Sequence, residues 1–190
     1  MTAADIAYVR ANYRTLEEAC AERSETFDEV RKLIAEARLP QPSYVLPDGT
    51  EMVPADYFDL ADAGRQDFAR RFLEAGGAPS DLEEEWQGYL SGAYGVCLKV
   101  QSPENIVRKD QLVRAIERRL ERPSPADPEW RDELRTSVEE LDLLERPFAP
   151  DYDRARWGPS SRDRCVTAPR ESFPEVFARA AVGSPSASSA

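Results

Sequence analysis

Residues 102–144, SPENIVRKDQLVRAIERRLERPSPADPEWRDELRTSVEELDLL, decide the fold of this chain. Ser102–Pro103 and Asp127–Pro128 each combine a helix-capping side chain with a proline suited to the first helical turn. After each signature, apolar residues recur with helical period, up to Leu120 in the first segment and up to Leu144 in the second. The stretch therefore predicts two consecutive amphipathic helices.

Helix starts are also marked upstream of this pair. Three capping boxes, in which a hydroxyl and a carboxylate satisfy the first free N–H groups of a helix, are Thr15 with Glu18, Thr26 with Glu29, and Ser80 with Glu83. Between the last two boxes, ADYFDLADA and RQDFARRFLEAGG have helical patterns, and Gly76 or Gly77 is placed to end the second. Gly92 and Gly95 interrupt the apolar run GAYGVCLKV, which predicts a kinked helix there.

A β-hairpin is predicted for residues 43–53, SYVLPDGTEMV. Its turn, PDGT, places a proline that fixes φ beside a glycine that accepts positive φ, and apolar residues flank the turn on both sides. We predict a mainly α fold: a single domain of about seven helices, with one β-hairpin after an N-terminal helix–turn–helix-like unit.

The chain divides into segments of different composition. Residues 5–60 form the helix–turn–helix-like unit with its hairpin, and residues 80–146 form the helical core. Residues 147–182 are rich in Pro, Arg, Asp and large aromatic rings. Their apolar residues follow neither the period of a helix nor that of a strand, so we expect an ordered but irregular C-terminal segment. Together these segments make one helical domain over 1–182, followed by a flexible tail, GSPSASSA, at 183–190.

The absence of histidine narrows the chemistry. With no His in 190 residues, the usual neutral-pH base, imidazole metal ligands and nucleophile–His triads are all excluded. Neither GxGxxG nor Gly–Lys–Ser/Thr is present, so a nucleotide phosphate cradle is not supported. We therefore predict no metal and no cofactor.

Charge and hydropathy limit the partners. The formal net charge of −11 repels phosphate backbones at long range, so nucleic acid is not an expected binding partner. No apolar run reaches the length of a membrane span, and the N-terminus MTAADIAYVRANYR lacks a basic stretch followed by an apolar one. We expect a cytoplasmic protein without a membrane partner.

Three cysteines, Cys20, Cys97 and Cys165, are an odd number without CxxC spacing, so we expect reduced thiols rather than disulfides or a zinc site. Cys20 and Cys97 lie among apolar or helical residues, where a cysteine usually acts as a small hydrophobic residue. Cys165 follows the charged string SSRDR, and neighbouring arginines can lower the pKa of a thiol. A reactive Cys165 is the lesser alternative.

The N-terminal segment resembles a known DNA-binding unit. LEEACAER, SET and FDEVRKLIAEARLPQPSYVLPDGTEMV follow one another as helix, turn, helix and hairpin, an order similar to the winged helix–turn–helix of MerR-type regulators. The expected recognition helix, 27–38, carries three acidic and three basic residues, so it lacks the excess of cations that favours DNA binding. A MerR-like regulator is therefore the alternative function.

Candidate site residues gather in the C-terminal segment. Arg154, Arg162 and Arg164 would grip an anionic group, since guanidinium groups bind carboxylate or phosphate through paired hydrogen bonds. Candidate carboxylates that orient these arginines or exchange a proton, and aromatic rings that contact the ligand, are Asp151, Asp153, Asp163, Tyr152 and Trp157. The alternative is an ion-pair network that ties this segment to the helices.

A second group lies in WQGYLSGAYGVCLK, where Tyr89 and Tyr94 are candidate hydrogen-bond donors in catalysis and Lys99 is a candidate substrate-binding cation. Tyr89 shares a helical face with Trp86 and Ala93, a pattern that is also typical of a packed core. We expect the site where the C-terminal segment crosses the helices that carry these residues, because irregular segments on a rigid scaffold often carry function.

Three strings, LPQPSYVLPDGTEMVPADYF, YLSGAYGVCLKVQSPENIVRKDQLV and LDLLERPFAPDYDRARWGPSSRDR, resemble a family of small bacterial natural-product biosynthesis proteins of unknown function. The resemblance spans roughly residues 5–175 and implies work in a secondary-metabolite pathway. It brings no catalytic residues with it.

The expected function is binding of a small-molecule biosynthetic intermediate. If the protein is an enzyme, we expect a cofactor-independent isomerase, cyclase or lyase that relies on Tyr, carboxylate and Arg side chains. Besides the MerR-like regulator, the other alternative is a non-catalytic partner of a pathway enzyme.

Overall fold

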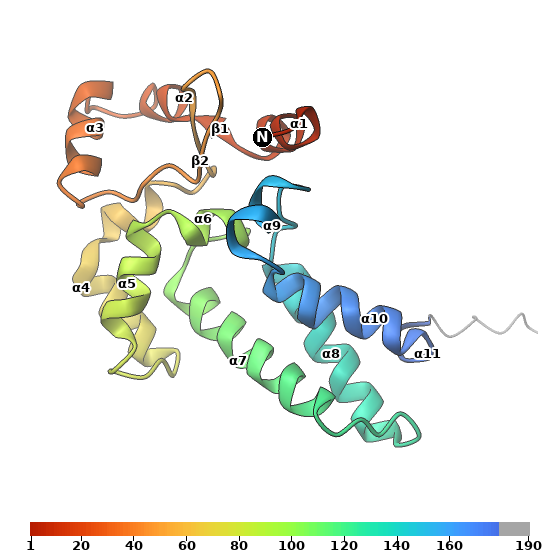
Figure 1. Ribbon diagram of the computed structural model, residues 1–190. Helices are drawn as coiled ribbons and strands as arrows, with labels where there is room; N and C mark the ends of the chain where they lie inside the picture. The colour runs from red at the N-terminus through yellow and green to blue at the C-terminus, as the bar shows by residue number, and fades with distance from the viewer. Residues whose placement is uncertain (179–190) are drawn as a thin grey trace, which may run out of the picture.

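The computed structural model describes residues 1–178, which form a mainly helical protein with a small sheet near the N-terminus (Figure 1). The predicted tail at 183–190 and the last residues of the predicted domain lie outside this range. Helices α1 to α3 lie at one end of the molecule, and α7, α8 and α10 lie at the other. Within residues 1–178, no helix combines the length and apolar character that crossing a membrane requires.

The N-terminal part holds three helices and the sheet: α1 (Ala3–Asn12), β1 (Arg14–Thr15), α2 (Leu16–Cys20), α3 (Phe27–Ala35), β2 (Tyr44–Val45) and β3 (Glu51–Val53). The predicted capping boxes at Thr15 and Thr26 are both confirmed. A third box, Thr2 with Asp5, opens α1, a helix that we did not predict.

The predicted hairpin is confirmed, and it is part of a larger sheet than expected. β2 and β3 pair antiparallel, with Tyr44 opposite Met52. The two-residue strand β1 pairs with the other edge of β3, with Arg14 opposite Val53, so the strand order is β1-β3-β2. Helices α2 and α3 precede this hairpin in the chain, but the predicted helix–turn–helix unit and its DNA binding both stay predictions.

The middle of the chain contains α4 (Asp59–Glu74), α5 (Leu82–Leu90) and α6 (Ala93–Cys97). The two helices predicted for the first of these segments form one element that is broken at Gly64, where φ is 83°. The helix ends as expected, since the Gly76 and Gly77 amides donate to carbonyls of its last turn. The predicted kink is also confirmed, because Gly92 has φ 78° and separates α5 from α6.

The capping box predicted at Ser80 is wrong. The Ser80 hydroxyl donates to the neighbouring Asp81 carboxylate at 2.7 Å, and α5 begins after Asp81 without a side-chain cap. Because aspartate is itself a good acceptor, it takes the hydroxyl that would otherwise bind the free amides.

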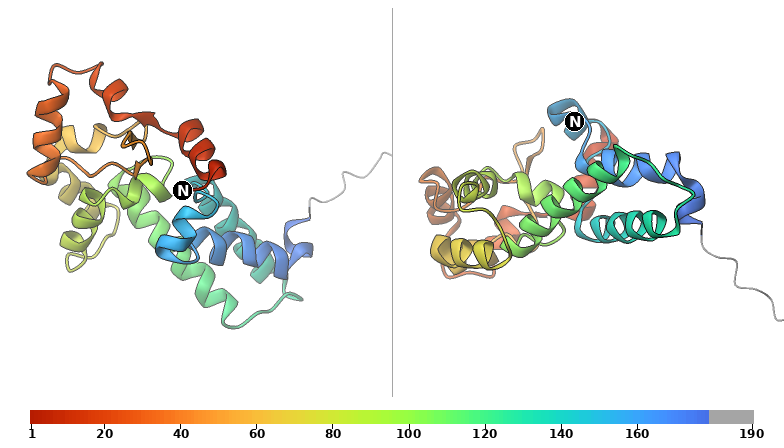
Figure 2. Two further views of the ribbon diagram at one scale, coloured as in Figure 1. Left: turned by 45° about the horizontal axis from the view of Figure 1, so that its top comes forward. Right: turned by 90° about the horizontal axis from the view of Figure 1, so that it is seen from below.

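The two long helices are α7 (Pro103–Leu120) and α8 (Pro128–Leu144). Both predicted starts are confirmed: Ser102 accepts a hydrogen bond from the Asn105 amide, and Asp127 accepts one from the Glu129 amide. The helices lie side by side in both views of Figure 2. A buried cluster joins them to the C-terminal segment and comprises Leu112, Ile116, Trp130, Leu134, Val138, Leu141, Cys165, Val166 and Val176.

The C-terminal segment is ordered, as predicted, but it is not irregular. It contains α9 (Tyr152–Trp157), the π-helical turn η1 (Asp163–Thr167), α10 (Ala168–Ser172) and α11 (Pro174–Phe177). Prolines in the first turns of α10 and α11 start new helices while ending the ones before, which is why no long period is visible in the sequence. With these elements and α1, the described residues hold more helices than the seven we expected.

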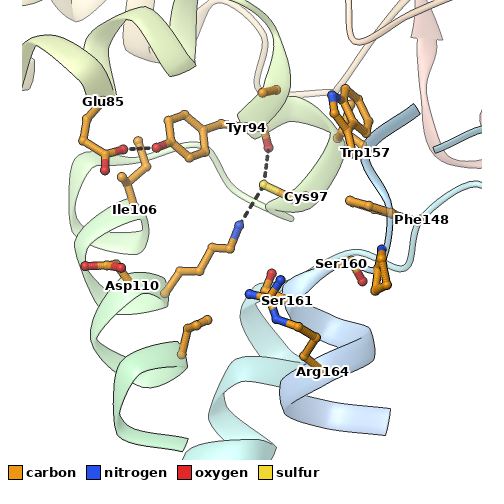
Figure 3. A pocket seen from close by; sticks show the side chains of 15 residues that line it. Glu85, Tyr94, Cys97, Ile106, Asp110, Phe148, Trp157, Ser160, Ser161 and Arg164 are labelled. Carbon is orange, nitrogen blue, oxygen red and sulfur yellow. Dashed lines mark hydrogen bonds between the residues drawn. The ribbon is translucent and has the colours of Figure 1, made fainter. Parts of the chain in front are cut away.

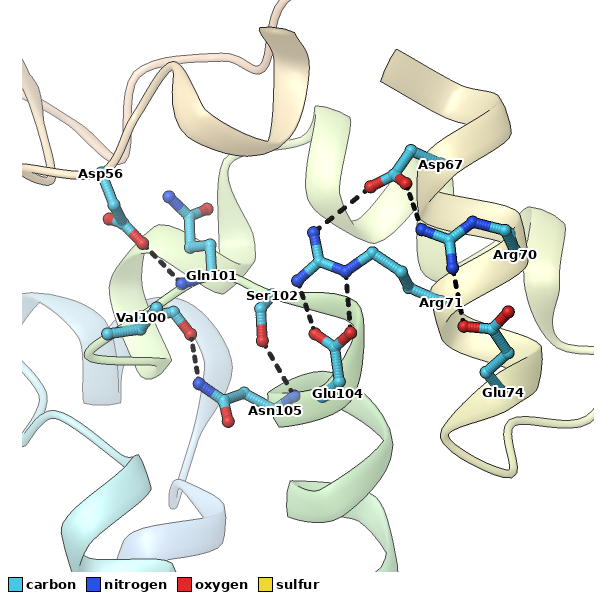
Figure 4. A network of polar contacts seen from close by, with 10 residues as sticks. All are labelled: Asp56, Asp67, Arg70, Arg71, Glu74, Val100, Gln101, Ser102, Glu104 and Asn105. Atoms are coloured by element: carbon cyan, nitrogen blue, oxygen red, sulfur yellow. Dashed lines mark hydrogen bonds and ion pairs between the residues drawn. The ribbon is translucent and has the colours of Figure 1, made fainter. Parts of the chain in front are cut away.

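Polar contacts fix the start of α7 against α4 (Figure 4). Arg71 of α4 reaches Glu104 with Nε and one terminal nitrogen, both at 2.7 Å, and its other terminal nitrogen lies 3.3 Å from Asp67. Just before α7, the backbone amide of Gln101 donates to the Asp56 carboxylate at 2.6 Å. Since paired Arg–carboxylate bonds are directional, they set the position of α7 as well as stabilising it.

The N-terminal part also holds α6 in place. The Tyr13 hydroxyl donates to the Gly95 carbonyl at 3.1 Å, and the Ser43 hydroxyl donates to the Gly92 carbonyl at 3.3 Å. Gly95 is buried, and a Cβ atom there would overlap the Ser43 hydroxyl. The hairpin and α6 can therefore approach this closely only because residue 95 has no side chain.

Candidate functional site

A short antiparallel bridge brings the ends of α6 and α8 together. Leu98 pairs with Glu145, the Lys99 amide donates to the Leu144 carbonyl, and the Arg146 amide donates to the Cys97 carbonyl, both at 2.9 Å. The bridge places Cys97 beside Glu145, although 48 residues separate them in the chain. α7 lies next to both, and its second turn supplies Lys109.

A cavity of about 420 Å³ opens beside these residues (Figure 3). It lies between α5, α6 and α7 on one side and the C-terminal segment on the other. The residues that line it are Glu85, Ala93, Tyr94, Val96, Cys97, Ile106, Lys109, Asp110, Val113, Phe148, Trp157, Pro159, Ser160, Ser161 and Arg164.

A chain of polar contacts runs along the floor of the cavity. Lys109 Nζ lies 3.2 Å from Cys97 Sγ and 3.5 Å from a Glu145 carboxylate oxygen. The Ser161 hydroxyl donates to the same oxygen of Glu145, whose other oxygen is buried without a hydrogen-bond partner. Only 1% of the Glu145 side chain and 19% of the Lys109 side chain are exposed. A thiol and an ammonium thus lie at the wall of the cavity, and a buried carboxylate behind the wall holds the ammonium.

Burial controls the protonation of these groups. It raises the pKa of the Cys97 thiol above its ordinary value, although the ammonium of Lys109 opposes the rise. Burial likewise raises the pKa of Glu145, against the effects of Lys109 and Ser161. Burial would lower the pKa of Lys109, but the neighbouring Cys97 and Glu145 raise it above its ordinary value. We therefore assign a thiol to Cys97 and an ammonium to Lys109 at neutral pH.

A second polar pair, between α5 and α6, lies on the same side of the cavity. The Tyr94 hydroxyl donates to the Glu85 carboxylate (Figure 3). Burial raises the pKa of Glu85, and the nearby negative charge of Asp110 adds to the rise. The Glu85 carboxyl therefore keeps its proton to a higher pH than an ordinary glutamate does.

The outer wall is aromatic and basic. The Phe148 and Trp157 rings lie 5.8 Å apart between centroids, and 43% of Trp157 is exposed. Arg156 stacks on the Trp157 ring at 4.2 Å and orients it. Arg164 lines the cavity and lies 3.4 Å from the Glu117 carboxylate. A flat ligand is able to lie against the rings with an anionic group at the guanidinium.

Three of the residues predicted for the site line this cavity: Tyr94, Trp157 and Arg164. Tyr89 does not. It is completely buried in the cluster with Phe68 and Trp86, and its hydroxyl has no hydrogen-bond partner. Lys99 also points elsewhere, since its ammonium donates to the Asp142 carbonyl at 2.9 Å on the exposed surface.

The predicted carboxylates have structural contacts. Asp153 is completely buried, accepts hydrogen bonds from the Tyr44 hydroxyl at 2.6 Å and the Ala149 amide at 2.7 Å, and lies outside the cavity wall. Asp163 accepts the Ser160 amide and pairs with Arg154 at 2.7 Å, which forms a turn.

The remaining predicted residues join the segment to other parts of the fold. Arg162 pairs with Asp142 at the end of α8. The amides of Asp151 and Tyr152 donate to the buried Asp5 carboxylate of α1 at 2.9 and 3.1 Å. These contacts match the alternative of a stabilising network more closely than the expected anion site.

Lys109, Glu145, Ser161 and the accessible face of Cys97 were not predicted. Lys109 is three residues after Ile106 and four before Val113, so it interrupts the apolar stripe of α7. A lysine within an apolar stripe is the sequence feature that could have pointed to this site. Glu145 directly follows an apolar stripe in the same way. The interpretation of Cys97 as a packing residue holds for one face only, since the thiol also borders the cavity. Among residues 1–178, no three Cys, Asp or Glu side chains converge as metal ligands.

Comparisons with known proteins add a family but no activity. No curated protein and no solved structure matches the chain. The family described as "Family of unknown function (DUF6058)" matches residues 65–174, which include Cys97, Lys109, Glu145 and Ser161. Because the match covers more than half of the 190 residues, the chain belongs to this family of unknown function.

Proposed function

We propose that the protein binds a small organic molecule, with a flat apolar part and a carboxylate, in the cavity between α6, α7 and the C-terminal segment. The observation that carries this proposal is the cavity itself, whose lining combines aromatic rings with the half-buried Cys97 thiol and the Lys109 ammonium, which the buried Glu145 carboxylate holds. A volume of about 420 Å³ lies within the usual range for small-molecule sites.

The lining suggests how such a ligand is oriented. Phe148 and Trp157 offer ring faces to its flat part. Arg164, whose partner Glu117 lies at 3.4 Å, is the more exposed of the two cations that line the cavity and would meet the carboxylate. Lys109 and Cys97 then face the opposite end of the molecule.

We further propose that the ligand is an intermediate of natural-product biosynthesis, as the sequence resemblance implies. Conversion of it by isomerisation, cyclisation or elimination would use Tyr94, Glu85 and Lys109 as proton donors and acceptors. DNA binding has less support, because each cation of the expected recognition helix region is paired: Arg31 with Glu51, Lys32 with Glu36, and Arg38 with Glu36.

Calorimetric titration with 3-benzoylpropionate, which has a phenyl ketone and a carboxylate, tests this proposal. We expect saturable binding to the wild-type protein, weakened roughly tenfold by Arg164→Ala, since a charge-assisted hydrogen bond contributes about 1.5–3 kcal/mol. Arg118→Ala is the matched control, because Arg118 lies on the exposed side of α7 away from this cavity. Absence of binding, or equal weakening by both substitutions, would contradict the proposal.

A further inference from the structure

One feature of the cavity is not needed for binding alone. The Cys97 thiol lies at the cavity wall with the Lys109 ammonium at 3.2 Å, and Lys109 is held in turn by Glu145, which Ser161 fixes. The other two cysteines, Cys20 and Cys165, are buried outside the cavity lining. An ammonium beside a thiol stabilises the thiolate, which is the nucleophilic form of cysteine.

We infer that Cys97 is a nucleophile that adds reversibly to an α,β-unsaturated carbonyl compound bound in the cavity, with Lys109 as the group that moves the proton. This inference rests on the proposed function, because it names the chemical class of the ligand at the same site. Soft electrophilic alkenes are natural partners of a thiolate, whereas Lys109 in its charged form is not itself nucleophilic.

The addition balances without any other reactant. The sulfur lone pair forms a bond to the β carbon, and the alkene π pair moves toward the α carbon and the carbonyl oxygen. Because Lys109 is already an ammonium, the thiol proton first leaves to water and the resulting thiolate attacks; Lys109 then gives one proton to the α carbon and takes one back from water. The product contains all atoms of thiol and alkene, and elimination runs the same steps in reverse.

The surroundings of Cys97 favour this role for Lys109. Glu145, from the strand-like residues after α8, attracts the ammonium at 3.5 Å and keeps it beside the sulfur. Other charged groups facing the cavity are Glu85 of α5, Asp110 of α7 and Arg164 of η1. Glu85 is occupied by the Tyr94 hydroxyl and Asp110 pairs with Arg114 at 2.9 Å, so Lys109 is the cation in contact with the thiol.

Intact-protein mass spectrometry with 3-benzoylacrylate, the unsaturated counterpart of 3-benzoylpropionate, tests the inference. We expect a single adduct on the folded wild-type protein, located on Cys97 by peptide mapping, and none on Cys97→Ser. The inference is overturned if Cys97→Ser is modified at the wild-type rate, or if the adduct lies on Cys20 or Cys165.

Lys109→Gln separates the role of the ammonium from that of the thiol. We expect adduct formation to slow by at least roughly tenfold, the change that one unit of thiol pKa produces. Lys32→Gln is the control, because Lys32 is 75% exposed and only its partner Glu36 lies nearby. Thermal melting checks that each variant is folded. An unchanged rate in folded Lys109→Gln would remove Lys109 from the mechanism.

The two ligands distinguish this inference from the proposed function. Binding of 3-benzoylpropionate without any adduct from 3-benzoylacrylate would leave the binding function and overturn the covalent step. Failure of both compounds, with Cys97 still accessible to iodoacetamide, would contradict the ligand class and with it the inference. Protection of Cys97 from 3-benzoylacrylate by excess 3-benzoylpropionate would support both.

Discussion

At the scale of single residues, the state of the Cys97 thiol is set by its burial and by one ammonium. Burial raises its pKa, so most of the population is protonated at neutral pH. The reactive fraction therefore increases as pH rises toward that pKa. The charged neighbours that face this thiol across the cavity are Lys109, Glu145, Glu85, Asp110 and Arg164.

We predict that carbamidomethylation of Cys97 by iodoacetamide accelerates roughly tenfold per pH unit between about pH 6 and 8, because the thiolate is the reacting form. The rate is measured by quenching the alkylation at a series of times and quantifying the modified Cys97 peptide. Lys109→Gln should shift the same profile to higher pH. A rate that does not vary with pH over this range would show that Cys97 is already ionised and that Lys109 outweighs its burial.

Arg162 illustrates how a residue predicted for a site can serve stability. It pairs with Asp142, which also binds Arg170 at 2.9 Å, and all three side chains are partly buried. We predict that Arg162→Ala lowers the free energy of unfolding by about 1 kcal/mol, since a partly buried ion-pair network contributes more than an exposed pair. Urea denaturation measures this loss. Ligand affinity in the same variant should stay at the wild-type value, and a weakened affinity would return Arg162 to the binding site.

At the scale of elements, the contact between α4 and α7 makes stability depend on pH. Hydrogen bonds from Arg71 lower the pKa of Glu104 from 4.5 to about 2, although 47% of this side chain is exposed. A carboxyl whose folded pKa is depressed stabilises the fold above its unfolded pKa. Its contribution is lost as the pH falls from about 4.5 toward 2.

We predict that Glu104→Gln lowers the free energy of unfolding by about 0.5–1 kcal/mol at pH 7, a value reduced by solvent screening at this exposed position. The difference from wild type should shrink as the pH is lowered through 4 and 3. Urea denaturation at each pH provides the measurement. The control is Glu121→Gln at the exposed far end of α7. A difference that is constant with pH would mean that Arg71 does not hold Glu104 ionised.

The elements themselves were largely predictable, because their ends are coded locally. The caps at Ser102 and Asp127 and the glycine ends at Gly76 and Gly92 depend on residues a few positions apart. The short C-terminal helices were missed because they are stabilised by packing rather than by their own period: η1 and α11 pack on α7 and α8, and Tyr152 of α9 packs on the N-terminal cluster. β1 was missed for the same reason, since two residues have no pattern of their own.

At the scale of the whole molecule, one buried cluster joins the N-terminal part to residues near positions 96 and 149. It contains Val9, Tyr13, Tyr44, Leu46 and Met52 from the N-terminal part, together with Val96 and Ala149. Residues far apart in sequence thus share a core, which favours cooperative unfolding.

We predict that Val9→Ala lowers the free energy of unfolding by about 2 kcal/mol, because Val9 is completely buried and its loss leaves a cavity. All three tryptophans, Trp86, Trp130 and Trp157, lie in the later part of the chain. Their fluorescence transition should therefore move together with the far-ultraviolet circular dichroism transition. Separate midpoints would show that the N-terminal part unfolds independently.

The candidate site depends on this long-range organisation, which limits its prediction from sequence. The residue types were visible, and three residues predicted for the site, Trp157, Tyr94 and Arg164, line the cavity; their roles there stay predictions. The contacts that link Cys97, Lys109 and Glu145 were not predicted, because a backbone bridge between segments 48 residues apart creates them. No local pattern encodes such a pairing.

The hydrogen bonds from Tyr13 and Ser43 to α6 have a consequence for how this protein can diverge. The family match begins at residue 65, yet the helix that carries Cys97 is supported by residues before it. Drift in α1 or the hairpin is therefore able to shift the thiol relative to Lys109 while every lining residue stays the same. New ligand preferences can therefore evolve through substitutions in the residues that support α6. A relative without these N-terminal residues must stabilise α6 by other means.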